Sequence, residues 1–304
     1  MKNIVFLFII FISLICNAQT PLWQGKGRIV IGADGNEHDN DDWAATPLSL
    51  ALVASQGLQD KLVAYVYSNH VWGSSVENKY IHGLSPYEQM HQSALGGQKW
   101  FGFNKTNFIC AVDDPETAYN AVRDEINKSS KDNPLFIIEG GPMQVVGEAI
   151  SRADKNKLKY VTLISHSPWN DNHANESYGG WDSHFGWTWN QIKEQFAAPE
   201  NGNLNMVHIA NQNGKDEYPI IYPAIKTDYR KFDWIKTSKF KDKAPYYQKG
   251  SWDWLYSRLY TFIECRGGSI FDASDAGMVV FLFTGIEYTS PDIVRRLIEK
   301  EYNL

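Results

Sequence analysis

Short apolar runs rich in β-branched residues alternate along the chain with longer segments in which apolar residues recur at helical spacing. The short runs predict strands, and the longer segments predict amphipathic helices. Repeated strand–helix alternation is typical of an α/β fold, with a mostly parallel β-sheet and helices on both faces. Strands are predicted over residues 29–34, 62–68, 107–112, 135–139, 158–165 and 205–210, and helices over 41–55, 85–100, 115–129 and 144–153.

The last third of the chain is less regular. Residues 211–250 are rich in Lys, Asp, Tyr and Pro, which predicts short helices that wrap the surface. Longer helices are predicted over 251–264 and 291–302, with an apolar segment at 278–283 between them. Because no repeat, low-complexity segment or linker divides the sequence, we expect one α/β domain over residues 19–304.

Polar residues follow the predicted strands repeatedly. Asp34 follows the first strand, Asn69 and His70 follow the second, and polar residues also begin the segments 140–144 and 165–173. In parallel sheets the carboxyl ends of the strands meet at one edge, and ligands bind there. The sequence therefore predicts a ligand site at this edge.

The most distinctive of these strand ends carries five carboxylates within nine positions: Asp34, Glu37, Asp39, Asp41 and Asp42. Carboxylates this close in sequence repel one another unless a cation or shared protons relieve them. Oxygen ligands in this number suit Ca²⁺ or Mg²⁺. The alternative is that the Asp pair only caps the following helix, but a cap needs one or two acids and does not explain Asp34.

Residues 1–18 have the pattern of a signal peptide. Lys2 is followed by an apolar stretch over 4–15 and then by a small residue, Ala18, at the expected cleavage point. The apolar stretch is too short for a membrane span. This predicts export, to the periplasm or outside the cell. Export would permit a disulfide between Cys110 and Cys265, although their apolar surroundings fit two buried thiols equally well.

The overall charge narrows the range of partners. The formal net charge is −6, and the chain has no long basic run. These features argue against a nucleic acid polymer or an anionic membrane as the main partner. The sequence has 11 Trp and 16 Tyr residues, many in polar surroundings. Flat rings beside polar groups suit a sugar, so we expect a small-molecule sugar or nucleoside substrate, with self-association left open.

Four segments, in order and with similar spacing, resemble the signature segments of nucleoside hydrolases. A strand that ends in Asp34 is followed by the pair Asp41–Asp42 at a helix start, and a second strand ends in Asn69. A Gly-Pro turn lies within 136–144, and a late Asp lies within 274–276. Through these segments the chain is similar to the inosine/uridine-preferring nucleoside hydrolase fold, as a divergent secreted member of that superfamily.

This resemblance implies a bound Ca²⁺ and assigns roles around it. Asp34 and Asp42 would be carboxylate ligands, Gln144 would provide its main-chain carbonyl, and Asp275 would complete the set. Asp34 would also be the general base that takes a proton from a bound water, and Asp41 the second catalytic residue, in contact with sugar hydroxyls. Attack at the anomeric carbon would pass through an oxocarbenium-like state.

The sequence also departs from the family pattern. The segment between Asp34 and Asp41 is longer, and an ungapped comparison would put Glu37 or Asp39 in the base position. Ser274 stands where the family has a His that serves the leaving base. The Glu-x-Asn sugar segment has no match. The nearest polar candidates for substrate contacts, beside Asn69, are His70, Trp169, Asn170, Asn172, His173 and Asp182.

These departures argue more strongly against a nucleoside substrate than against a sugar substrate. The first hypothesis is therefore a secreted, calcium-dependent glycosidase that acts on an O-glycoside or oligosaccharide. The second is a carbohydrate-binding protein that keeps the nucleoside hydrolase fold without turnover. The third is an exported hydrolase of N-ribosyl bonds for nucleoside salvage.

Overall fold

The computed structural model describes residues 20–35, 40–72, 81–173, 186–214, 224–241 and 248–299. The predicted signal peptide lies outside these residues, and so do Glu37, Asp39 and Asp182. Within the described part of the chain, no helix has both the length and the apolar character needed to cross a membrane.

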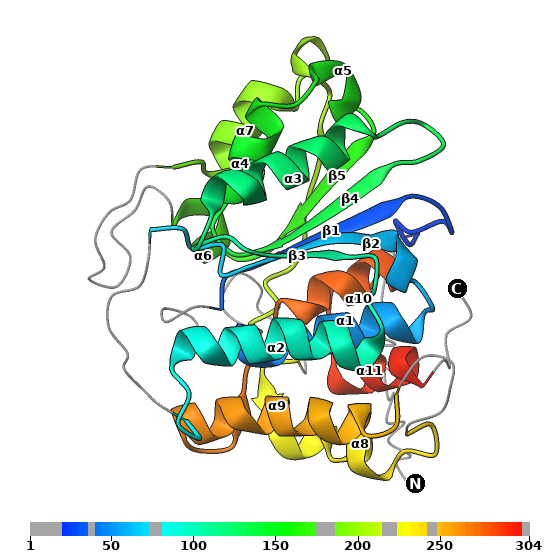
Figure 1. Ribbon diagram of the computed structural model, residues 1–304. Coiled ribbons are helices and arrows are strands. Elements are labelled where there is room, and N and C mark those ends of the chain that lie inside the picture. Colours follow the sequence, from blue (N-terminus) through cyan, green and yellow to red (C-terminus); the bar gives the residue numbers. More distant parts are fainter. Residues whose placement is uncertain are drawn as a thin grey trace, which may run out of the picture.

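Six parallel strands form the central sheet, in the order β3-β2-β1-β4-β5-β6 (Figure 1). This confirms the predicted α/β class and the parallel sheet. From β1 the chain adds β2 and then β3 toward one edge of the sheet, and from β4 it adds β5 and then β6 toward the other edge. The strand order therefore reverses between the neighbours β1 and β4. The strands are β1 (Arg28–Ala33), β2 (Leu62–Tyr67), β3 (Asn107–Cys110), β4 (Leu135–Gly140), β5 (Val161–Ser165) and β6 (Asn205–His208).

Helices cover both faces of this sheet (Figure 1). Alternate strand residues supply the two cores: Ile29 and Ile31 face one, while Val30 between them faces the other. One face is covered by α3 (Pro115–Asn127), α4 (Gln144–Ser151) and α7 (Trp189–Phe196). The other is covered by α1 (Asp42–Ser55), α2 (Pro86–Phe101), α10 (Ala276–Thr284) and α11 (Pro291–Ile298).

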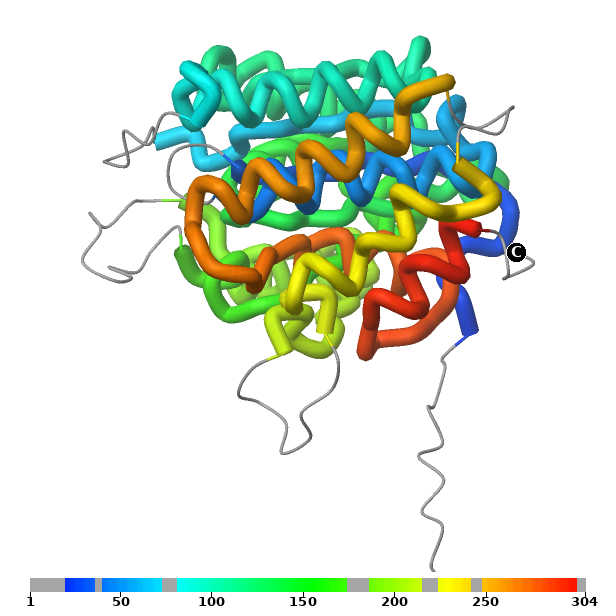
Figure 2. The backbone as a smooth tube through the Cα atoms, turned by 90° about the horizontal axis from the view of Figure 1, so that it is seen from below, coloured from blue at the N-terminus to red at the C-terminus, as the bar shows by residue number. Residues whose placement is uncertain are grey.

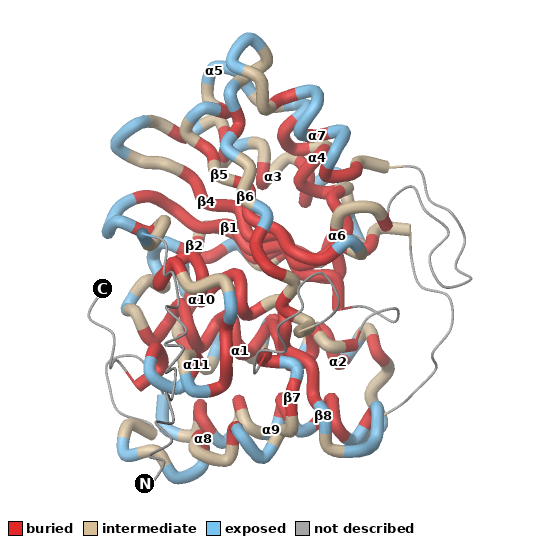
Figure 3. Tube along the Cα trace, turned by 180° about the vertical axis from the view of Figure 1, so that it is seen from behind, coloured by how far each residue is buried: buried red, intermediate tan, exposed pale blue. Residues whose placement is uncertain are grey.

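Helix α1 is enclosed on all sides, and all 14 of its residues are buried. The sheet lies on one side, and α9 (Ser251–Arg266) packs on the other as an outer layer (Figures 1 and 3). Pro47 inside α1 lacks the N–H that would bond to the carbonyl of Trp43. Ser93 of α2 donates its hydroxyl to that carbonyl oxygen instead, at 2.7 Å. The proline is therefore accommodated by a contact between helices.

The outer layer continues beside α9. The segment 224–241, which contains η3 (Tyr229–Phe232) and α8 (Trp234–Thr237), runs along α9 (Figure 2). A small antiparallel pair, β7 (Thr227–Asp228) and β8 (Ile270–Phe271), joins this segment to the chain that leads into α10. This pairing brings residues before 228 beside residues after 270.

Three local predictions were wrong. The strand predicted from Leu158 begins only at Val161, because residues 155–158 form the short helix α5, capped by Asp154. The polar stretch 166–187 that follows this strand was expected to be a long loop, but its described part contains the helix α6 (Pro168–Asn172). Helix α7 was not predicted, although Thr188 and Gln191 form a complete capping box at its start.

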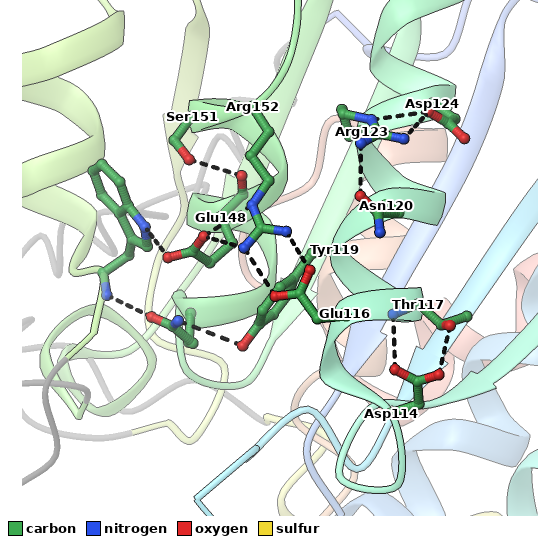
Figure 4. A network of polar contacts seen from close by, with 12 residues as sticks. Asp114, Glu116, Thr117, Tyr119, Asn120, Arg123, Asp124, Glu148, Ser151 and Arg152 are labelled. Carbon is green, nitrogen blue, oxygen red and sulfur yellow. Dashed lines mark hydrogen bonds and ion pairs between the residues drawn. The ribbon is translucent and has the colours of Figure 1, made fainter.

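Polar contacts join α3 to α4 on the sheet face that these two helices cover together with α7 (Figure 4). Arg152 of α4 forms ion pairs with Glu116 of α3 at 2.7 Å and with Glu148 at 2.9 Å. Its guanidinium also lies 4.9 Å from the ring centre of Tyr119. Each exposed ion pair contributes little alone, but together these contacts hold α4 in place behind the Gly-Pro turn that precedes it.

Candidate functional site

A cavity of about 590 Å³ lies at the carboxyl ends of β1 and β5, beside the point where the strand order reverses. The volume falls within the roughly 300–1,000 Å³ typical of ligand pockets. A doubly wound sheet places its ligand site at this position. The residues that line it include Asp34, Asp41, His166, Trp169, Asn170, Lys226, Arg266, Asp272, Ser274 and Asp275.

Three carboxylates converge at this cavity. One oxygen from each of Asp34, Asp41 and Asp42 lies within 4.8 Å of the other two. Asp41 occupies the N-cap position of α1, yet its side chain makes no capping hydrogen bond. Helix capping therefore does not account for Asp41. Three carboxylate oxygens at this spacing fit a hard divalent cation, which would relieve their mutual repulsion.

Asp275 and His166 line the same cavity and come from distant parts of the chain. Asp275 precedes α10 and His166 follows β5, and their Oδ1 and Nε2 atoms are 2.6 Å apart. The backbone N–H of Gln212 donates to Nδ1 of His166 at 3.3 Å. Because Nδ1 accepts this bond, the imidazole proton lies on Nε2 and is donated to Asp275. His166 therefore orients Asp275 and is not available as a base.

Glycines at two strand positions make room for these acids. A Cβ on Gly140 would lie 3.0 Å from Cγ of Asp275, and a Cβ on Gly32 would lie 2.5 Å from Oε1 of Glu139. Gly32 and Glu139 are directly paired between β1 and β4. The two strands that flank the reversal point therefore allow carboxyl groups to lie against the sheet itself.

Glu139 is a buried acid behind the cavity that sequence reasoning did not select. It accepts a hydrogen bond from Nδ2 of Asn69. Burial, together with the negative charges of Asp34 and Asp275, raises the pKa of Glu139 well above its ordinary value. We expect Glu139 to keep its proton at pH values at which an ordinary glutamate has lost it. The sequence feature that could have identified Glu139 is a charged residue near the end of an otherwise apolar strand.

Glu139→Gln is expected to stabilise the protein at neutral pH in the absence of divalent cations. Above the ordinary pKa of 4.5, the unfolded chain loses this proton while the folded chain keeps it. In that window each pH unit costs the folded wild type about 1.4 kcal/mol. Gln does not titrate, so its advantage should grow from pH 5 to pH 7 in urea unfolding.

The matched control for this prediction is Glu200→Gln at an exposed position, which should show no such pH-dependent gain. A Glu139→Gln variant that is no more stable than wild type at pH 7 would contradict the protonated state of Glu139.

The predicted substrate residues are divided between the cavity and the interior. Trp169 and Asn170 of α6 line the cavity. His70 and His173 are buried and face each other, with their Nε2 atoms 2.9 Å apart. The ring of Trp169 stacks on His173 at 4.2 Å, so the histidine pair supports the wall that Trp169 forms.

Other predicted residues lie behind or away from this cavity. Asn69 is fully buried and contacts Glu139. Asn172 is half-buried at the end of α6 and, within the described chain, does not line the cavity. The side chain of Gln144 lines a separate, smaller pocket, where its Oε1 accepts the backbone N–H of Trp187 at 2.9 Å. The structure brings Asp34, Asp41 and Asp42 together and places Asp275 at the same cavity, whereas the side chain of Gln144 lies elsewhere.

Two basic residues that sequence reasoning missed line the same cavity. Lys226 precedes β7 and Asp272 follows β8, so the β7–β8 pairing brings these two residues together. They form an ion pair with 2.5 Å between Nζ and Oδ2. Arg266 donates to Oδ1 of Asn40 at 2.6 Å, and Nδ2 of Asn40 donates to Cys265 Sγ at 2.9 Å. Asn40 thus joins the end of α9 to the acidic start of α1. No local pattern marked these contacts, because they depend on tertiary packing.

The two cysteines of the described chain are not joined in a disulfide. Cys265 is buried, and Cys110 is half-buried at the end of β3. Of the two states that the sequence left open, the structure has the one with two free thiols. The sequence could not decide between the two states, because an apolar neighbourhood suits a thiol and a disulfide equally.

The fold and the site together define a doubly wound parallel α/β protein with an acid-lined cavity at its switch point. The search against protein-family models found no match. Over 275 residues the chain is 32% identical to the uncharacterized protein P22 of Formosa agariphila, which covers 88% of this chain and 87% of that protein. The chain belongs to the same family as this protein.

Among solved structures, the chain is similar to the inosine-uridine preferring nucleoside hydrolase from Bacillus anthracis. The superposition has a TM-score of 0.42 and 12% sequence identity, and it covers 90% of this chain and 99% of that one. A likeness at this level does not bear on the chemistry of the cavity.

Proposed function

We propose that this protein hydrolyses glycosidic bonds in the acid-lined cavity and that it does so with a bound Ca²⁺. The observation that carries the proposal is the convergence of Asp34, Asp41 and Asp42 at the switch point of the sheet, with their oxygens within 4.8 Å of one another. Such clustered carboxylates are typical of sites that bind a cation or handle protons.

The donor set favours Ca²⁺ over a softer metal, because it consists of carboxylate oxygens. Asp34 and Asp42 would hold the ion, and Asp275, which lines the same cavity as Asp34, would complete the set. A bound cation supplies a Lewis acid that lowers the pKa of water and binds sugar hydroxyls. A main-chain contribution from Gln144 is part of the proposal.

The residues of the chain would divide the remaining work. Asp34 is proposed as the general base, since it is a buried carboxylate that lines the cavity. Asp41 would accept hydrogen bonds from sugar hydroxyls and, by its negative charge, stabilise an oxocarbenium-like transition state. His166 would keep Asp275 oriented through the 2.6 Å contact.

A sugar is the proposed substrate, as an O-glycoside or oligosaccharide, with an N-ribosyl bond as the narrower possibility. Trp169 offers an aromatic ring at the cavity wall beside the polar side chain of Asn170. This combination suits a sugar ring, which has an apolar face and a rim of hydroxyls. The signal-peptide pattern of residues 1–18 supports a secreted or periplasmic location as part of the same proposal.

One observation favours carbohydrate binding without turnover as a second candidate. Departure of a leaving group usually requires a proton donor. Both ring nitrogens of His166 are engaged in hydrogen bonds, and Asp272 is paired with Lys226. Neither side chain is therefore placed to donate a proton, and Ser274 lines the cavity where the resemblance would put a histidine.

Removal of calcium separates these possibilities. The chain from residue 19 onward is expected to release reducing sugar from aryl glycosides or oligosaccharides, to lose this activity on chelation, and to regain it with Ca²⁺. Inosine and uridine serve as parallel substrates, and release of ribose from them would select the nucleoside reaction.

Two further results would change the proposal. Saturable sugar binding without turnover would select the binding function. An active enzyme that is indifferent to chelation, with no calcium-induced rise in Tm, would contradict the cation site.

A further inference from the structure

A second group of metal-ligating side chains lies at the carboxyl end of the edge strand β3, outside the acid-lined cavity. His91 of α2, Cys110 at the end of β3 and Asp113 in the following turn each place one ligand atom within 4.8 Å of the others. Within the described chain, none of these three residues lines the cavity. Helix α2 and the strand–turn segment 110–113 thus bring together an imidazole, a thiol and a carboxylate.

Tyr87 holds two of these three residues. Its hydroxyl donates to the carboxylate of Asp113, with oxygen–oxygen distances of 2.9 and 2.7 Å. Its main-chain carbonyl lies 3.2 Å from Nδ1 of His91. A carbonyl can only accept, so Nδ1 carries the imidazole proton and Nε2 keeps its lone pair. Second contacts of this kind commonly orient the histidine and carboxylate ligands of metals.

The backbone beside this group is strained. Ser68, at the end of β2, has a φ of 51° although it is not a glycine, and it is fully buried. Left-handed backbone at a buried serine is uncommon and tends to occur at functional sites. The next strand holds Cys110, and Tyr67 pairs with Cys110 across the sheet. The strain thus lies directly against the proposed ligands.

We propose that His91, Cys110 and Asp113 bind one Zn²⁺-like transition metal ion, separate from the calcium site proposed above. A thiolate with an imidazole selects zinc-like ions, whereas an all-oxygen set selects Ca²⁺. Tetrahedral bonds of about 2.0–2.3 Å separate ligand atoms by roughly 3.3–3.8 Å, so small side-chain adjustments would complete the site. A water would take the fourth position.

The position of the cluster gives the ion a structural role. Cys110 must lose its thiol proton to bind a metal, so binding would release one proton. Since β3 is an edge strand of the sheet, the ion would also fasten this edge to α2.

Cobalt spectroscopy on the untagged, reduced chain tests this site. Co²⁺ would be titrated in excess Ca²⁺, so that the oxygen site is occupied by the harder ion. We expect one equivalent of Co²⁺ to bind with a thiolate-to-cobalt charge-transfer band. The band should vanish in Cys110→Ser and persist in the matched control Cys265→Ser, which removes the other cysteine of the described chain.

Two further variants make the result decisive. Tyr87→Phe removes only the hydroxyl that holds Asp113 and should weaken cobalt binding by about 10- to 100-fold. His91→Gln retains Cys110 and should also lose tight cobalt binding. This variant takes the place of Cys110→Ser in the test if Cys110→Ser does not fold. Absence of a thiolate band in folded wild type, or an undiminished band in His91→Gln, would overturn the proposal. Sugar release plays no part in this readout, so it is independent of the proposed function.

Discussion

Replacing Asp34 with Asn is expected to lower glycoside hydrolysis by roughly 100- to 10,000-fold, the range typical of a lost general base. The substitution keeps the size of the side chain, and its Oδ1 can still accept the backbone N–H of Gly35, at 2.6 Å in the wild type. It removes the negative charge that both base catalysis and cation binding require. The fold should therefore persist while the chemistry is lost.

The measurement combines initial rates with thermal unfolding in the presence and absence of Ca²⁺. Asp34→Asn should lose both activity and the calcium-induced rise in Tm. Asp114→Asn is the matched control, because it makes the same change at an exposed cap of α3, and Asn is an equally good cap. Full activity in Asp34→Asn would rule out this residue as the base.

Trp43→Ala is expected to destabilise the protein by about 3–5 kcal/mol, as for other fully buried aromatic residues. Trp43 is the second residue of α1, next to Asp42, and its indole N–H donates to the carbonyl of Gly35 at 3.0 Å. The side chain therefore joins the strand end that carries Asp34 to the helix start that carries Asp41 and Asp42. Calcium affinity should fall together with stability.

Denaturant unfolding and calcium titration would measure the two effects separately. Trp43→Phe keeps an aromatic ring but loses the N–H contact and part of the buried volume, so a smaller loss of about 1–3 kcal/mol is expected. If Trp43→Ala unfolds at the same urea concentration as wild type, the proposed link between strand and helix carries little energy.

The periodicity of the sequence was sufficient for the layered fold and its central strands. Strands such as β1 and β4 are buried on both faces, so they appear in the sequence as continuous apolar runs. The short helix α5 was missed because its four residues, three of them polar, show no apolar stripe. The polar character of the loop after β5 likewise concealed α6, which begins at Ser167-Pro168.

The site could be predicted only where its residues lie at strand ends or within a recognisable segment. Asp34 directly follows a strand, Asp41 lies in the recognisable segment at the next helix start, and the structure brings the two together. Glu139 depends on the glycine at the paired position 32 for its space, and His166 depends on the backbone N–H of Gln212 for its tautomer. These relations join residues far apart in sequence, so no local pattern reveals them.

The complete enclosure of α1 has a consequence for how the acidic site would work. Every residue of this helix is buried, including Asp42, and Asp41 is its N-cap, so a shift of this helix start would disturb both the sheet and the outer helices. The mutual repulsion of the carboxylates would therefore be overcome when the chain folds, and the proposed cation would meet ligands that are already assembled. We expect cation binding to cause little structural rearrangement.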